Sequence, residues 1–196
     1  MTECDLHTFF MSNPNRSAGA RRTHLLQMAY PVNFIAVSKL PPTTGGGYRW
    51  WFTSKDAAAL LKPFNKAVQL QDLMKCSIKG LKYYAMYVGT TSDLMERCEW
   101  HLKDHNPASI RSKTLSNLRH TIGALLGLKR AVSQQAVSAV LSRCYFEWIP
   151  LTEYKEWEKD ELRSTAYSYP LNVQKNVMMQ PQDLAVLKNL RKFHKK

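Results

Sequence analysis

The sequence predicts a mixed α/β (α+β) domain in which a small central β-sheet of about three strands is flanked by helices. Short aromatic and β-branched segments, bounded by glycine and proline, alternate with longer segments whose apolar residues recur at helical spacing. A chain of 196 residues is also long enough for one domain with a hydrophobic core. We therefore expect one folded unit with extensions at both ends.

The first third of the chain predicts an arm, two strands and a helical region. Residues 1–30 are largely polar and predict an N-terminal arm. The stretches 30–40 and 48–54 are rich in β-branched or aromatic residues, and "PPTTGGG" separates them. Residues 55–75 have helical spacing, but Pro63 interrupts them, so we expect two short helices there.

A strand, a turn and a helix are expected next. "LKYYAMYVG", residues 81–89, predicts a strand. "TSDLMERCEWHLKDH", residues 91–105, predicts a helix, because Ser92 or Asp93 can cap its start and apolar residues recur every four positions.

The remaining chain is mostly helical. Residues 109–143 predict helices with a break at Gly127, residues 144–150 alternate as a strand, and residues 151–167 predict a helix. The parts that we expect are an N-terminal arm at 1–30, a folded domain at 31–175 and a basic helical tail at 176–196.

The charge of the chain favours a nucleic-acid partner. Lys and Arg number 28 against 15 acidic residues, which gives a net charge of +13. Such an excess is typical of proteins that meet phosphates, although acidic membranes and acidic proteins are alternative partners. Five basic side chains are expected to bind backbone phosphates without reading sequence: Arg111, Lys113, Arg119, Lys129 and Arg130. The tail adds Arg191, Lys192, Lys195 and Lys196.

The cysteines and the apolar runs indicate the compartment. The four cysteines are far apart, so neither a zinc site nor a disulfide scaffold is expected. The N-terminus has no signal-peptide pattern, and no run of 18 apolar residues occurs. We expect a soluble cytoplasmic protein.

Tyr87, Arg97 and His101 form a candidate catalytic group. Tyr87 lies at the end of a predicted strand, and Arg97 and His101 share one face of the following helix because they are four residues apart. A phenol, a guanidinium and an imidazole suit phosphodiester cleavage, which needs a proton acceptor and positive charge near the phosphate. In the alternative interpretation the three residues only pack or face solvent.

Further segments along the chain add to the candidate group of Tyr87, Arg97 and His101. "YVG" stands at 87–89, with Arg97 and His101 ten and fourteen residues after its tyrosine, and "ELRSTAYSYPLN" stands at 161–172. Together they resemble the GIY-YIG nuclease superfamily. "GGY" at 46–48 resembles the first half of the family signature, and its distance from Tyr87 implies a bacterial branch with an insertion between the first two strands. Tyr83, Tyr84 and Tyr30 are the alternatives to Tyr48.

The resemblance implies a set of site residues. The catalytic positions would be Tyr48, Tyr87, Arg97, His101, Glu161 and Asn172. Either tyrosine would orient or deprotonate the attacking water, Arg97 would pair with the scissile phosphate, and Asn172 would fix the local geometry. Glu161 would hold a divalent cation, Mg²⁺ or Mn²⁺, with Glu158 and Asp160 as alternatives. Thr90 replaces the lysine that many members carry after the second signature half.

The function implied by the resemblance is metal-dependent endonucleolytic cleavage of DNA, with RNA as the alternative substrate. A second hypothesis is a catalytically inactive nucleic-acid-binding module with the same fold, which the replacement at Thr90 favours. A third is a protein-interaction domain whose charge serves solubility.

Overall fold

The computed structural model describes residues 33–36, 40–64, 68–102, 116–163, 166–173 and 176–195. The predicted arm at 1–30 lies outside these residues, as do the basic side chains of Arg111 and Lys113 and the alternative tyrosine Tyr30.

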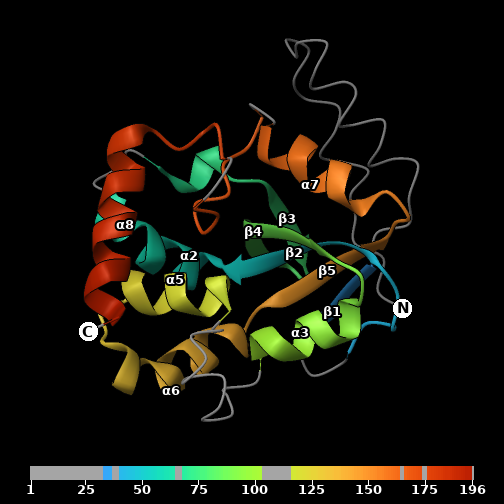
Figure 1. The fold of residues 1–196 in the computed structure, drawn as a ribbon, viewed down its shortest axis with the longest axis horizontal. Helices are drawn as coiled ribbons and strands as arrows, with labels where there is room; N and C mark the ends of the chain where they lie inside the picture. The colour runs from blue at the N-terminus through green and yellow to red at the C-terminus, as the bar shows by residue number, and fades with distance from the viewer. Residues whose placement is uncertain are drawn as a thin grey trace.

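Five antiparallel strands form the sheet, in the order β1-β5-β2-β4-β3 (Figure 1). Their bounds are β1 Asn33–Ala36, β2 Gly46–Thr53, β3 Lys75–Ile78, β4 Leu81–Thr91 and β5 Tyr145–Pro150. The mixed α/β class is therefore confirmed, but the sheet is larger than the three strands expected. Sequence reasoning missed β3, which Lys79 and Gly80 join to β4 in a tight hairpin with both residues at positive φ, 52° and 78°.

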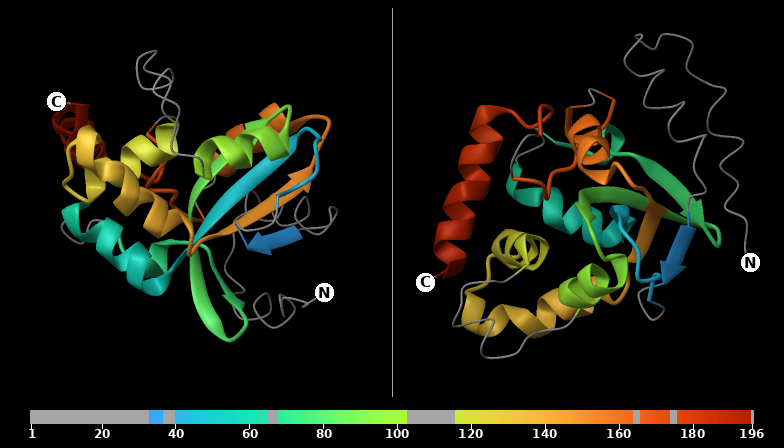
Figure 2. Two further views of the ribbon diagram at one scale, coloured as in Figure 1. Left: turned by 90° about the horizontal axis from the view of Figure 1, so that it is seen from below. Right: turned by 45° about the vertical axis from the view of Figure 1, so that its right-hand side comes forward.

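Helices pack on both faces of this sheet (Figure 2). Their bounds are α2 Ser54–Leu61, α3 Leu94–Leu102, α5 Asn117–Leu125, α6 Arg130–Leu141, α7 Tyr154–Arg163 and α8 Pro181–Lys195, with short 3₁₀ turns η1 Lys62–Phe64 and η2 Leu70–Asp72. Side-chain caps set several starts: the Thr53 hydroxyl accepts from the Asp56 amide at 3.1 Å, and the Asp93 carboxylate accepts from the Glu96 amide at 2.9 Å. Regular α2 ends before Pro63, as expected.

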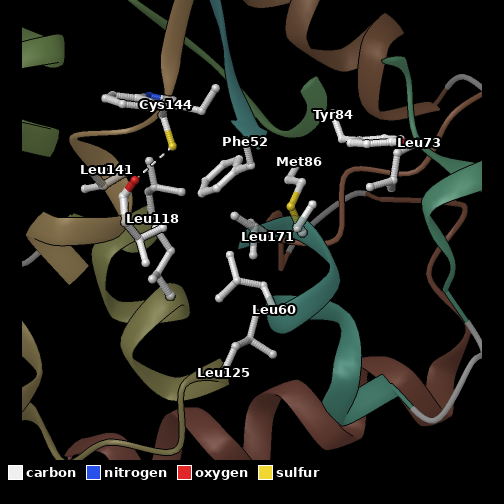
Figure 3. Close-up of a cluster of buried hydrophobic side chains, with 14 of the residues drawn as sticks. Phe52, Leu60, Leu73, Tyr84, Met86, Leu118, Leu125, Leu141, Cys144 and Leu171 are labelled. Atoms are coloured by element: carbon white, nitrogen blue, oxygen red, sulfur yellow. Dashed lines mark hydrogen bonds between the residues drawn. The ribbon is translucent and has the colours of Figure 1, made fainter. Parts of the chain in front are cut away.

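Two hydrophobic clusters lie on opposite faces of the sheet. Side chains of β2 such as Trp50 and Phe52 pack with Leu60 of α2 and Leu118 of α5, and part of this larger cluster is shown in Figure 3. On the other face a smaller cluster forms around Trp157 of α7. The alternation of side chains along β2 therefore gives each face its own helical cover.

Helix α8 packs beside α5 (Figure 1). Leu187 of α8 is fully buried, and the imidazole of His194 lies 2.6 Å, through Nδ1, from the Leu128 carbonyl oxygen. The domain boundary at residue 175 stays a prediction. Among the described helices, none has the length and apolar character needed to cross a membrane.

Candidate functional site

Tyr48 and Tyr87 meet on the paired strands at the centre of the sheet. Tyr48 of β2 pairs with Gly89 of β4, and a Cβ atom on Gly89 would lie 2.5 Å from the Tyr48 hydroxyl oxygen. A residue without a side chain is therefore required where the phenol crosses β4. The ring centroids of Tyr48 and Tyr87 are 6.4 Å apart. The "GGY" and "YVG" segments thus form one structural unit, while Tyr83 belongs to the cluster on the opposite face.

A β-bulge in β4 directs Tyr87 to the same face as Tyr48. The register of β2 and β4 shifts between Trp50 and Trp51, and Met86 is the extra residue on β4. Strict alternation would place neighbours on opposite faces. Instead, Met86 belongs to the larger cluster and Tyr87 packs against that same cluster.

Helix α3 contributes His101 and Arg97. His101 is buried, and its Nε2 lies 3.1 Å from the Tyr48 hydroxyl oxygen. Arg97 is partly exposed, and its guanidinium carbon lies 4.5 Å from the ring centroid of Trp100. The structure therefore brings together the residues that the sequence singled out around the β4–α3 turn.

Ser116 contacts the other nitrogen of the His101 ring. Its Oγ lies 2.5 Å from His101 Nδ1 and also accepts a hydrogen bond from the Arg119 amide at 3.3 Å, as the N-cap of α5. The imidazole is thus held at both nitrogens, between Tyr48 and Ser116. Such a contact fixes the orientation of the ring.

Glu158 of α7 contacts β4 directly after the "YVG" segment. The Thr90 hydroxyl donates to Glu158 Oε2 at 2.9 Å. Burial is the largest cause of the raised pKa values of Tyr48 and Tyr87, and the charge of Glu158 raises both further. Its side chain is partly exposed. The Thr90 hydroxyl therefore holds a carboxylate in this chain.

Glu161, the metal ligand preferred from the sequence, lies on the opposite face. It is buried and forms an ion pair with Arg49, with 2.7 Å between Arg49 Nη2 and Glu161 Oε1. The Tyr169 hydroxyl donates to its other oxygen. Arg49 follows Tyr48 directly in β2, so the two side chains point to opposite faces. Both oxygens of Glu161 therefore already have protein partners, while Asp160 is exposed to solvent, and the metal assignment of Glu161 stays a prediction.

The helix geometry explains the difference between the two glutamates. Glu161 is four residues after Trp157, so both lie on the side of α7 that faces the sheet. Glu158 is turned by about 100° from Trp157. A Cβ on Gly47 would lie 2.3 Å from the Trp157 ring, so the glycine lets α7 pack closely against β2.

Asn172 pairs with the backbone of β4 beside Tyr87. Its Oδ1 accepts from the Val88 amide at 3.0 Å, and its Nδ2 donates to the Val88 carbonyl oxygen at 2.8 Å. The Leu171 amide donates to the Met86 carbonyl oxygen at 3.0 Å. The "PLN" loop therefore holds β4 on both sides of Tyr87, in keeping with the geometric role expected of Asn172.

The proton affinities of the central groups are strongly shifted. Burial raises the pKa of Tyr48 well above its usual value and raises that of Tyr87 to about 12, while Arg97 lowers both. Burial lowers the pKa of His101 to about 3, and the charges of Arg97 and Arg119 lower it further. In the substrate-free protein at neutral pH the phenols and the imidazole are therefore uncharged.

The basic residues predicted to bind nucleic acid fall into different environments. Arg119 is buried, and its guanidinium donates to the His101 carbonyl oxygen at 3.0 Å and to Ser138 Oγ at 2.9 Å. It links the end of α3 to α6, and its predicted contact with the nucleic-acid backbone stays a prediction. Lys129 is exposed and Arg130 is partly exposed, both at the start of α6.

Sequence reasoning missed Ser116, and it gave Thr90 no positive role. Ser116 lies within a predicted helical stretch, and only its position as the N-cap of α5 brings it to His101. Thr90 lies directly after "YVG" and was treated as a departure from the family pattern. A capping signal at Ser116 was visible in the sequence, but not its partner.

The comparisons with known proteins agree with this arrangement. A family model described as the GIY-YIG catalytic domain matches residues 46–193, which is more than half of the chain. No significant match was found among curated proteins or among solved structures. The matching domain implies nuclease-type hydrolysis of phosphodiester bonds in a nucleic acid, and its members typically use a divalent metal. This chain, with its paired signature strands and α3 residues, belongs to the GIY-YIG catalytic-domain family.

Proposed function

We propose that this protein is a divalent-metal-dependent DNA endonuclease whose catalytic residues are Tyr48, Tyr87, Arg97, His101 and Glu158. The observation that carries the proposal is the convergence of two phenols, an imidazole and a guanidinium from β2, β4 and α3, with the carboxylate of Glu158 bound to Thr90 of β4. Each of these groups has a chemical role in attack on a phosphodiester. Asn172 holds β4 in place and acts as a positioning residue.

We assign the metal to Glu158. The described residues contain no group of three or more His, Cys, Asp or Glu side chains that could hold a metal alone. One carboxylate still fits Mg²⁺ or Mn²⁺, because Mg²⁺ commonly keeps several waters and takes other oxygens from substrate phosphates. Glu158 is partly exposed, and the Thr90 hydroxyl binds one of its oxygens. When bound, such a cation would stabilise the negative charge that develops on the phosphate.

The hydrogen-bonded chain from Tyr48 to Ser116 supports a path for the proton of the attacking water. Ser116 Oγ has two lone pairs, so it can accept from both the Arg119 amide and His101 Nδ1–H. His101 Nε2 is then free to accept from the Tyr48 hydroxyl, 3.1 Å away. As the water gives its proton to the Tyr48 oxygen, Tyr48 passes its own proton to His101.

Substrate binding would favour this transfer. Arg97 lowers the pKa of His101, and a phosphate that pairs with Arg97 offsets that positive charge. The pKa of His101 therefore rises when substrate binds, which makes the imidazole a better proton acceptor. The contact with Trp100 steadies the guanidinium of Arg97, whose planar fork suits a phosphate.

DNA is the substrate that we favour, with RNA as the alternative. The net charge of +13 would attract either polymer. Lys129 and Arg130 remain candidates for contacts with backbone phosphates, together with Arg111 and Lys113, which lie outside the described residues. Their contacts would strengthen binding without reading sequence.

The test is nicking of supercoiled plasmid by the purified protein, with Mg²⁺, with EDTA, and with the variant Arg97→Ala. We expect cleavage that requires both the metal and Arg97. A matched control is Arg163→Ala, which removes an exposed arginine from α7. Cleavage that persists in EDTA or in the Arg97 variant would contradict the mechanism.

The second candidate function is a catalytically inactive nucleic-acid-binding module. Its specific support is Thr90, which replaces a cationic residue common at this position in related nucleases. This function predicts salt-sensitive binding of DNA with no cleavage in Mg²⁺ or Mn²⁺. Failure to bind DNA at any salt concentration would instead favour the protein-interaction hypothesis.

A further inference from the structure

Arg191 of α8 is anchored on α5. Its Nη1 donates to Thr121 Oγ1 at 3.1 Å, and its Nη2 donates to Asn117 Oδ1 at 3.0 Å. Thr121 and Asn117 are four residues apart on α5, so one helix face holds both terminal nitrogens. The guanidinium therefore has a defined position, unlike a side chain that moves freely in solvent.

The anchor lies at the end of α5 that borders the candidate site. Asn117 directly follows Ser116, whose Oγ contacts His101. Arg191 also interacts electrostatically with Tyr87 and lowers its pKa, although burial has the largest effect on that pKa and raises it. Arg97 lowers the same pKa from α3. Tyr87 is therefore within the field of two guanidinium groups from two different helices.

The charge of Arg191 is not neutralised by protein carboxylates in the described part of the chain. No ion pair joins Arg191 to an acidic side chain among those residues. Arg191 is partly buried, and burial lowers its pKa. A positive charge that is partly removed from water without an anionic partner is costly, so an anion at this position would stabilise it.

The geometry of the guanidinium leaves donors for such an anion. Each terminal nitrogen carries two protons, and the contacts with Thr121 and Asn117 use one on each. Because the side chain is already ordered by α5, binding of a phosphate costs less conformational entropy than binding by a free lysine.

We propose that Arg191 binds a phosphate of the substrate backbone next to the scissile phosphate, so that α8 forms a second wall of the nucleic-acid site. This inference rests on the proposed function. Arg97 holds the scissile phosphate on the α3 side of Tyr87, and Arg191 holds the neighbouring phosphate on the α8 side. The C-terminal helix thus contributes a specific contact in addition to its packing against α5.

The test compares Arg191→Gln with Lys188→Gln. Both variants remove one positive charge from α8, but Lys188 is exposed, whereas Arg191 is partly buried. Binding of a fluorescent DNA duplex is measured by anisotropy in EDTA over a range of salt concentrations. Plasmid nicking in Mg²⁺ then gives kcat and KM, and a thermal midpoint checks that each variant is folded.

We expect Arg191→Gln to weaken DNA binding and to lower kcat/KM, each by about tenfold or more. The slope of log binding constant against log salt concentration should fall by about the amount that corresponds to one phosphate contact. The Lys188 variant should change either quantity by less than about threefold. Equal effects of the two variants would overturn the inference. If Arg191→Gln does not fold, Arg191→Lys replaces it in the test. We expect this variant to bind DNA about threefold to tenfold more weakly with an unchanged salt slope, because it keeps the charge and loses the planar guanidinium. DNA binding equal to wild type would overturn the inference.

The two proposals fail in different ways. Absence of nicking by the wild-type protein, with the salt slope still reduced in Arg191→Gln, would overturn the nuclease function and support the phosphate contact. Nicking by wild type, with Arg191→Gln indistinguishable from Lys188→Gln, would support the nuclease function and overturn the contact.

Discussion

Strand β2 separates two polar regions that use similar residues differently. On the face of Tyr48, uncharged groups form a chain from the phenol through His101 to Ser116, with Arg97 of the same helix partly exposed. On the face of Arg49, charged groups are sealed from water: Arg49 pairs with Glu147 and Glu161 at 2.7 Å each. The first region is built from neutral groups, and in the second the charges are paired with each other.

The two glutamates of α7 summarise this difference. Glu158 and Glu161 are three residues apart, yet Glu158 is partly exposed and accepts from Thr90, while Glu161 is buried and pairs with Arg49. A buried, paired carboxylate holds a helix against a sheet, and a partly exposed one can exchange ligands. The local environment of a carboxylate, more than its sequence position, decides which role it has.

The largest effect is expected for Glu158→Gln. If Glu158 holds the catalytic cation, loss of its charge should reduce metal-dependent nicking roughly 1,000-fold while the protein stays folded. Plasmid nicking and the thermal midpoint are the measurements. Asp160→Asn, which changes an exposed carboxylate on the same helix, is the control. Unchanged cleavage by the Glu158 variant would remove Glu158 from the site.

Glu161→Ala should act mainly on stability. It leaves the buried guanidinium of Arg49 with one counter-ion, and breaking a buried pair in this way costs about 3–5 kcal/mol. Urea unfolding measures the change. The cleavage that remains in the folded fraction should keep the metal dependence of wild type, and a large rise in the metal concentration required would return Glu161 to the catalytic site.

Gly89→Ala should disturb the packing around Tyr48 and leave the ion pairs of Arg49 intact. The new methyl group would lie 2.5 Å from the Tyr48 hydroxyl oxygen, so the ring must shift, and such overpacking costs about 1–3 kcal/mol. Urea unfolding and nicking assays should both show the loss. In Gly45→Ala the nearest atom would be 3.3 Å away, so this control should be tolerated; equal effects would argue against a specific clash.

A smaller effect is expected for Thr90→Val. The variant removes the hydrogen bond to Glu158 but keeps the shape of the side chain. Loss of a group that orients a metal ligand typically costs 10–100-fold, and we expect about tenfold in activity with a higher metal requirement. Thr90→Ser keeps the hydroxyl and should restore activity. If neither a higher metal concentration nor the hydroxyl of Thr90→Ser restores activity, the hydroxyl does not act through Glu158.

The smallest effect is a change in the pH dependence of stability. The pKa of His101 falls from 6.5 to about 3 on folding because burial disfavours the charged ring. Its contribution to stability is therefore present above pH 6.5 and is lost as the pH falls towards 3. His101→Gln should make urea stability less dependent on pH in this range.

His120 provides the matched control for this measurement. Burial lowers its pKa to about 3 as well, so it titrates over the same range in the folded protein. Each single variant should remove only part of the dependence of urea stability on pH, and the effects of His101→Gln and His120→Gln should add. An unchanged slope in His101→Gln would contradict a neutral, buried His101.

The sequence predicted the positions of the strands and helices of the site better than it predicted the directions in which their side chains point. β2, β4 and α3 were expected near their observed positions, because aromatic runs and a capped helix leave clear local signals. The choice between Glu158 and Glu161 was not accessible, because each residue turns a helix by about 100° and the contact of α7 with the sheet sets its rotation. The burial of Arg119 was not accessible for a similar reason: its charge suggested a surface position, but it lies between α3 and α6.

The loop that carries Asn172 also protects an edge of the sheet. Strand β3 covers β4 only as far as Tyr84, and the backbone beyond could otherwise pair with a strand from another molecule. The Asn172 amide occupies both backbone groups of Val88, and Leu171 occupies the Met86 carbonyl. The side chain that steadies the catalytic strand therefore also guards the protein against edge-to-edge aggregation.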